Sequence, residues 1–247
     1  MTPGFISSSN LRTVLLALIA STSLTFGSCR LQSEKNPQIS EPLSETIIDQ
    51  RTAVEYYKKI ALGSDYGNGA KQIKKWQQDL RVWLRDSDYP DLTAELDRII
   101  VELNQLSSTI RIRRVTDRTD ANFIVFLSSA AEYADFEPDA EPYLQANWGL
   151  VWINWNSRSE IYAGSMYVDV FRTQTLAGRK HLLREEFTQG LGLLNDTYDY
   201  KDSIFYQGWT TGQEYSPIDR ELIRMHLGTQ VKPAMSAADI DAIDWRF

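Results

Sequence analysis

The stretch REEFTQGLGLLND, residues 184–196, decides the fold of this chain. Its pattern predicts a helix that ends at a glycine–leucine bend. At about 100° of rotation per residue, one side of this helix is an apolar stripe formed by Leu183, Phe187, Leu191 and Leu194. The neighbouring side is a polar row formed by His181, Glu185, Gln189 and Gly192. We therefore expect the helix to be anchored in a core by its apolar stripe and to present the polar row elsewhere.

The segments around this helix predict an α+β fold. Alternating or continuous apolar runs predict strands at residues 80–84, 110–115, 122–127, 149–155 and 161–171. Helical spacing and capping residues predict helices at residues 45–62, 90–106, 216–228 and 236–239. Residues 129–143 are acidic and contain two prolines, so a surface loop is expected there, and a polar, aromatic loop is expected at residues 197–215.

The spacing within the opening stretch resembles the zinc motif of metzincin proteases, H-E-x-x-H-x-x-G-x-x-H/D. Glu186 matches the catalytic glutamate and Gly192 matches the glycine. The three positions that hold zinc ligands in those proteases are occupied here by Glu185, Gln189 and Asn195.

Two later segments extend this resemblance over roughly residues 55–247. The run DSIFY, residues 202–206, is similar to the matrixin Met-turn, with Phe205 in place of the methionine. Residues 216–228 resemble the closing matrixin helix, and the run from Glu185 to Leu193 resembles an uncharacterised bacterial domain family with the signature E-E-x-T-Q-x-L-G-L. The resemblance implies one zincin domain at residues 44–247. Its twisted mixed sheet of about five strands would pack on two long helices, followed by the motif helix, a Met-turn-like loop and a C-terminal helix.

The side chains at the ligand positions do not suit zinc. The amides of Gln189 and Asn195 are poor zinc ligands, so the sequence predicts no zinc and no other cofactor. Together with Glu185 they would form a weak oxygen site better suited to calcium. A second candidate metal group is His181 with Glu185, which are also four residues apart, joined by Gln189 or Asp196.

Two functions fit this pattern. The first is a degenerate, non-catalytic module that binds a peptide or protein, with the peptide extended along an edge strand. The alternative is a divergent peptidase or cell-wall hydrolase that uses Glu186 as its general base. The net charge of −7 excludes neither function, but it argues against a nucleic-acid partner.

The N-terminal residues predict an exported lipoprotein. Residues 1–28 contain Arg12, an apolar run from Val14 to Ala20 and small residues before Cys29, as in a secretory signal peptide. The run FGSC, residues 26–29, resembles a bacterial lipobox. This resemblance implies lipidation of Cys29, a solvated tether at residues 29–43 and a membrane anchor facing the periplasm or exterior, with the outer membrane favoured. Cys29 is the only cysteine, so the sequence excludes an internal disulfide.

Overall fold

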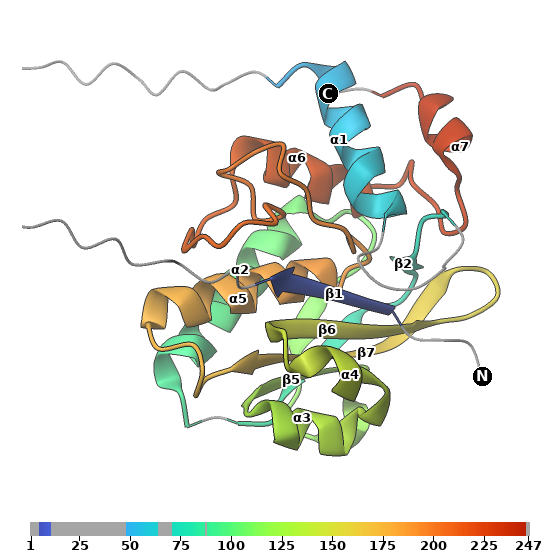
Figure 1. Ribbon diagram of the computed structural model, residues 1–247. Helices are drawn as coiled ribbons and strands as arrows, with labels where there is room; N and C mark the ends of the chain where they lie inside the picture. Colours follow the sequence, from blue (N-terminus) through green and yellow to red (C-terminus); the bar gives the residue numbers. More distant parts are fainter. Residues whose placement is uncertain (1–4, 11–47, 64–70, 87, 246–247) are drawn as a thin grey trace, which may run out of the picture. The chain divides into compact units, whose positions relative to one another are not determined.

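The computed structural model describes the backbone of residues 5–10 together with residues 48–63, 71–86 and 88–245 (Figure 1). The helices are α1 (Gln50–Leu62), α2 (Pro90–Leu106), α3 (Ala130–Phe136), α4 (Glu141–Leu144), α5 (Leu176–Gln189), α6 (Pro217–His226) and α7 (Ala237–Asp241), with 3-10 turns η1 (Arg118–Asp120) and η2 (Pro138–Ala140). The strands are β1 (Phe5–Asn10), β2 (Lys75–Trp76), β3 (Leu80–Leu84), β4 (Ile112–Arg114), β5 (Phe123–Ser128), β6 (Asn147–Trp155) and β7 (Glu160–Asp169).

These strands form one mixed, mostly parallel sheet in the order β1-β6-β7-β5-β3-β4, and β2 pairs separately with the start of β7. Strands β3, β4, β5 and β7 run parallel, whereas β6 is antiparallel to both β7 and β1. A mixed sheet was expected from the resemblance, and this coarse feature is confirmed. The expected five strands become seven because β2 has only two residues and β1 lies in the expected signal peptide, where no strand pattern was recognised.

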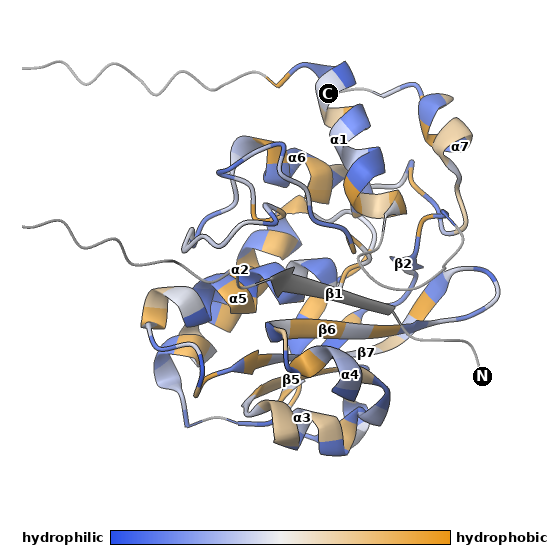
Figure 2. Ribbon diagram, in the orientation of Figure 1, coloured by the Kyte–Doolittle hydropathy of each residue, from blue (hydrophilic) through white to orange (hydrophobic). Residues whose placement is uncertain are grey.

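The two faces of the sheet are covered by different elements. On one face, side chains such as Phe123 and Val125 join the main core with residues of α2 and α5, for example Leu96 and Phe187. On the other face, Phe126 and its neighbours form a smaller apolar cluster under α3 and α4. Figure 2 shows hydrophobic colouring along β6 and a mixture of hydrophobic and hydrophilic colouring on α2, as expected for a buried strand and an amphipathic helix.

Helix α1 packs against α6 and α7, so the first described helix contacts the last two (Figure 1). The side chain of Asp49 accepts a hydrogen bond from the backbone N–H of Thr52 and caps the N-terminus of α1. The expected N-cap Ser44 lies outside the described residues, but the predicted helix start near residue 45 was too early, because Ile48 and Asp49 are not helical and α1 begins at Gln50. The C-terminus of α1 agrees with the predicted end at Leu62.

The expected surface loop at residues 129–143 was wrong, because this segment contains α3, η2 and α4. Ser129 and Glu132 form a capping box: the Ser129 hydroxyl accepts from the Glu132 N–H, and the Glu132 carboxylate accepts from the Ser129 N–H. This reciprocal pair starts a helix in a segment whose acidic and proline content suggested a loop. The prolines are compatible with it, since Pro138 and Pro142 stand in first turns.

The N-terminal predictions are only partly within reach of the described residues. Cys29, the tether at residues 29–43 and most of the expected signal peptide lie outside them. Strand β1 falls inside the expected signal peptide and pairs with β6. Within the described part of the chain, no helix has the length and apolar character needed to cross a membrane.

Candidate functional site

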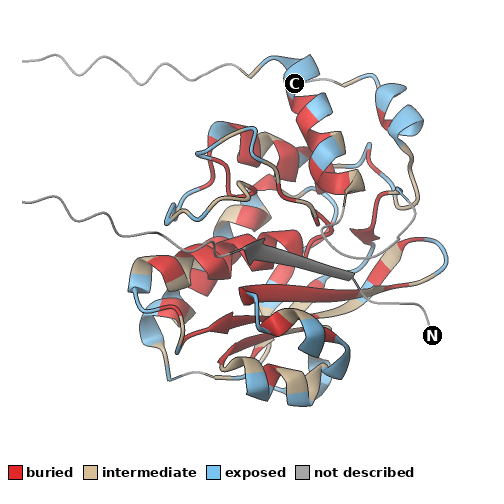
Figure 3. Ribbon diagram, viewed as in Figure 1, coloured by how far each residue is buried: buried red, intermediate tan, exposed pale blue. Residues whose placement is uncertain are grey.

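Helix α5, which carries the motif, is the most enclosed helix of the domain (Figure 3). The Thr175 side chain caps its N-terminus by accepting from the Gly178 N–H, and the helix ends at Gly190. The predicted apolar stripe is buried, with Leu183, Phe187 and Leu191 fully inaccessible. The polar row is buried as well, because α2, the sheet and the loop at residues 197–215 surround the helix. The apolar stripe is therefore buried as expected, but the expectation that the polar row is exposed was wrong.

His181 is held by the loop that follows the motif. Its Nδ1 lies 2.7 Å from the Gly212 carbonyl oxygen, so Nδ1 carries the proton and donates. Its Nε2 then accepts from the Thr210 hydroxyl at 3.2 Å. Burial lowers the pKa of His181, and the nearby positive charge of Arg184 lowers it further, so the imidazole is neutral. Its Nε2 also lies 3.4 Å from the carboxylate of Glu185, which brings the predicted pair together.

Gln189 is brought together with Asp196 and not with Asn195. Its Nε2 donates to the Asp196 carboxylate at 2.7 Å, while its Oε1 is buried without a partner among the described residues. Asn195 instead donates to the backbone carbonyl of Lys59 in α1 at 3.0 Å. Among the described residues, no group of three or more His, Cys, Asp or Glu side chains could hold a metal ion. This donor set does not fit the zinc of a metzincin.

The side chain of Glu186 extends from α5 toward β6. A side-chain carbon added at Gly149 would come within 2.7 Å of the Glu186 carboxylate, so this glycine leaves the space that the carboxylate fills. Burial raises the pKa of Tyr133 and Tyr167, and the charge of Glu186 adds to this effect. The candidate general base therefore lies against β6 at Gly149, with an exposed fraction of 0%.

Gly192 forms the bend that the motif predicts. Its φ of +114° is in the region that favours glycine. A side-chain carbon at this position would collide with the Lys74 carbonyl oxygen and approach His226 Nε2 to 3.1 Å. Three segments therefore meet at this bend, and glycine is required both by the backbone angle and by the close approach.

His226 connects the bend at Gly192 to α1 through two hydrogen bonds. Its Nε2 donates to the Leu191 carbonyl oxygen at 2.9 Å, and its Nδ1 accepts from the Tyr57 hydroxyl at 3.0 Å. Burial lowers its pKa to about 3, with a further contribution from the charge of Lys75. The sequence analysis assigned no role to this histidine, because its role depends on partners far away in the chain.

The Met-turn-like segment is tied to α6 through Asp219. The Ser203 hydroxyl donates to Asp219 at 2.5 Å, and the Ile204 N–H donates to the other oxygen of the same carboxylate at 2.9 Å. Burial raises the pKa of Asp219 to about 6 despite these hydrogen bonds. Phe205, at the position of the methionine in the resemblance to the Met-turn, is fully buried.

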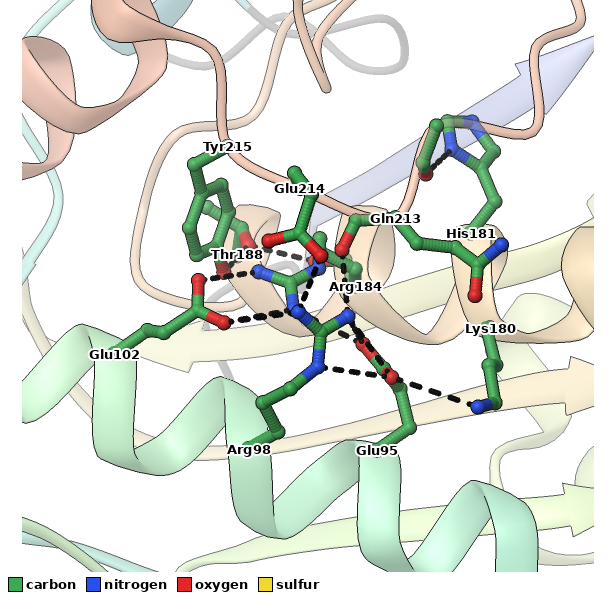
Figure 4. Close-up of polar contacts among 11 residues, drawn as sticks. Glu95, Arg98, Glu102, Lys180, His181, Arg184, Thr188, Gln213, Glu214 and Tyr215 are labelled. Atoms are coloured by element: carbon green, nitrogen blue, oxygen red, sulfur yellow. Dashed lines mark hydrogen bonds and ion pairs between the residues drawn. The ribbon is translucent and has the colours of Figure 1, made fainter.

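A network of ion pairs fixes α5 to α2, and sequence reasoning missed it (Figure 4). Arg184 is fully buried and donates to Glu95 and to Glu102, each at 2.9 Å. Its guanidinium also lies over the ring of Tyr215, 4.4 Å from the ring centroid. Arg98 donates to Glu95, Glu102 and Glu214, so both helices contribute cations. The sequence did contain a signal for this network: Glu95, Arg98 and Glu102 have i, i+3 and i+7 spacing, which places them on one face of α2.

A small cavity of about 90 Å³ lies beside His181, lined by residues of the loop that include Asp202, Thr210 and Glu214. Trp209 lies on the same side of α5, with its ring centroid 6.3 Å from that of His181 and 6.1 Å from that of Trp148 in β6. Its side chain is 41% exposed, which is unusual for tryptophan. The aromatic rings between β6 and the loop therefore reach the surface next to the motif helix.

A comparison with curated proteins found no match to this chain. The family model described as "Protein of unknown function (DUF2927)" matches residues 50–243, which span the helices and strands from α1 to α7. The motif helix, the bend at Gly192, the Ser203–Asp219 link and the Arg184 network all lie within the matched residues. This chain belongs to the DUF2927 family.

Proposed function

We propose that this protein is a non-catalytic binding module of the cell envelope, anchored through a lipid on Cys29, which holds an extended peptide or protein segment along β6. The observation that carries the proposal is strand β6, which β1 alone separates from the edge of the sheet. This nine-residue strand, NWGLVWINW, contains no charged residue and no proline. Long uncharged edges are avoided in proteins unless something pairs with them.

The opposite edge of the sheet provides a contrast. Strand β4 has three residues, and two of them are Arg113 and Arg114. A short, charged edge discourages pairing with another chain. Strand β6 has neither protection, and the strand that pairs with it, β1, lies in the expected signal peptide. Removal of residues 1–28 would leave the edge of β6 open.

The pairing of β1 indicates how a ligand would lie. Phe5 is opposite Ile153 and Ser7 is opposite Val151, in an antiparallel register. Strand β1 also lies against α5, so a bound peptide would run beside the motif helix (Figure 1). Addition of a strand supplies affinity through backbone hydrogen bonds, and side-chain pockets supply selectivity.

Two further observations support a metzincin-like module without catalysis. The glycine bend after the motif helix, the Ser203–Phe205 turn and the α6 helix follow one another in the order of that fold. A general base must reach water or substrate, whereas the Glu186 carboxylate is enclosed over Gly149. The hydrolase hypothesis is therefore less favoured than binding.

Alternate N-methylation of a peptide tests this proposal. The ligand is a synthetic peptide with the sequence of residues 3–12, added to a chain that begins at Arg30, whose thermal unfolding is first compared with that of the full chain. One derivative is N-methylated at residues 5, 7 and 9, and the other at residues 6 and 8. Because alternate N–H groups of a strand point to opposite sides, one derivative should lose binding and the other should retain it.

The control is the unmodified peptide added to the full chain, which should bind more weakly because β1 already occupies the edge. Equal binding of the two N-methylated derivatives, or no binding of the unmodified peptide to the shortened chain, would refute strand addition at β6.

A further inference from the structure

A cavity of about 290 Å³ lies on the sheet face that α3 covers, on the opposite face from α5. Trp83 of β3, Phe126 of β5 and Phe136 of α3 form its aromatic wall. The cavity is separate from the candidate functional site and from the β6 edge. Its volume is close to the lower end of the range for small-molecule sites in proteins.

Two arginines line this cavity, each held on an aromatic ring. The Arg85 guanidinium lies 5.3 Å from the centroid of the Phe126 ring, and that of Arg118 lies 5.4 Å from the centroid of the Phe136 ring. The two rings pack against each other with centroids 4.8 Å apart. Cation–π contacts of this kind fix the position of a guanidinium while its N–H groups stay available.

Neither arginine donates a side-chain hydrogen bond to a described residue. The Arg118 side chain makes no hydrogen bond or ion pair with any residue in the described part of the chain. Arg85 has only long ion pairs, 3.6 Å to Asp86 and 3.8 Å to Glu132, and no side-chain hydrogen bond to a described residue. A planar carboxylate matches the donor geometry of a guanidinium.

The same cavity carries negative charge on the α3 side. Glu132 and Asp135 line it, one turn apart on the helix. The capping hydrogen bond from the Ser129 N–H orients the Glu132 carboxylate and lowers its pKa, so that it is ionised near neutral pH. These oxygens can accept hydrogen bonds from an ammonium group.

We propose that this cavity binds a small zwitterion, an α-amino acid with an apolar or aromatic side chain. The carboxylate of the ligand lies on Arg85 and Arg118, its ammonium group on Glu132 and Asp135, and its side chain against Trp83 and Phe136. The combination of two cations, two anions and flat aromatic walls matches each part of such a molecule. This site is independent of the binding module proposed above.

Calorimetric titration of the full chain with L-phenylalanine, phenethylamine and 3-phenylpropanoate tests this assignment. L-Phenylalanine should bind saturably, and each analogue, which lacks one of the two charges, should bind at least about tenfold more weakly. Arg118→Gln should weaken binding of L-phenylalanine at least about tenfold, since Arg118 faces the ligand but supports no other described side chain by an ion pair. Asp135→Asn should weaken it by a smaller factor without changing the binding of 3-phenylpropanoate.

The matched control is Arg224→Gln, which alters an exposed arginine on α6 far from the cavity and should leave binding unchanged. Absence of saturable binding of L-phenylalanine would overturn the proposal. So would equal affinity for either analogue, or an Arg118→Gln protein that binds as tightly as the Arg224→Gln control.

Discussion

At the scale of single residues, Gly192 has the most demanding position in the motif. Its φ of +114° and its approach to the Lys74 carbonyl leave no room for a side chain. Gly192→Ala should lower the free energy of unfolding by at least about 3 kcal/mol, because backbone strain and overpacking act together. Gly212→Ala is the control: an added carbon there meets nothing within 4 Å. Denaturant unfolding of both variants measures the difference, and an equal effect would contradict the role given to the bend.

Two buried titratable residues, His226 and Asp219, make the free energy of unfolding depend on pH in opposite directions. The folded-state pKa of His226 is lowered to about 3 from 6.5, so the unfolded chain takes up a proton first and stability is lost as the pH falls below 6.5. The folded-state pKa of Asp219 is raised to about 6 from 3.8, so its contribution is present below pH 3.8 and is lost as the pH rises through 6. Between about pH 4 and 6 the two slopes oppose each other.

Single substitutions should separate these slopes. In His226→Gln the amide can keep both hydrogen bonds, and of the two residues only Asp219 still makes stability depend on pH. As the pH falls from about 6 to about 4, the free energy of unfolding of this variant should therefore change more favourably than that of the unmodified chain. In Asp219→Asn only the His226 slope remains, and acid should destabilise more steeply. Each slope is about 1.4 kcal/mol per pH unit. Unfolding free energies at several pH values measure this, and parallel curves for the two variants would disprove the assignment.

At the scale of secondary-structure elements, the Arg184 network joins α5 to α2. Arg184→Met removes the buried cation that pairs with Glu95 and Glu102 and leaves the partly exposed Arg98 as their main remaining partner, so it should cost about 3–5 kcal/mol of stability. Adding Glu95→Gln and Glu102→Gln to the same chain should restore a large part of this loss, because the excess negative charge beside Arg98 is then removed. Arg224→Met, which breaks the exposed pair with Glu221, is the control and should cost less than about 1 kcal/mol. A triple variant no more stable than Arg184→Met would show that the charges are not the cause.

The elements also show which structure could be predicted from sequence. Local signals were sufficient for α2, which begins at Pro90 and ends at Leu106 as expected, and for β3 and β5 within a residue or two at each end. They were insufficient for α5, because its polar residues find partners far away: Gly212 for His181, and Glu95 for Arg184. A polar row on a helix predicts exposure only when no other segment carries matching groups.

The candidate site also could be predicted only where local helix geometry places the residues. Resemblance placed Glu185, Gln189 and Asn195 together, and helix geometry alone supports only the first two, which lie four residues apart. Asn195 follows the bend, whose direction is set by Gly192 and His226. That direction turns Asn195 toward α1 and brings Asp196 to Gln189. The conformation after a left-handed glycine could not be read from spacing.

At the scale of the whole molecule, the proposed lipid anchor can be tested through Cys29. Cys29→Ala should abolish incorporation of labelled fatty acid and release the protein from the detergent phase on phase separation. Ser28→Ala is the matched control, because it keeps a small residue before Cys29 and should be processed normally. Membrane association and labelling of Cys29→Ala at the level of the unmodified chain would exclude lipidation at this residue.

The contact of α1 with α6 and α7 also has a consequence for the time at which the domain can fold. The Tyr57 hydroxyl bonds to His226, 169 residues later, and Lys58 pairs with Asp241, 183 residues later. Contacts of such long range form late and slow the folding of a domain. During synthesis α1 can contact Asn195, Asp199 and Ser203 before its helix partners α6 and α7 appear. The docking of α1 is therefore complete only when α6 and α7, the last described helices, have been synthesised.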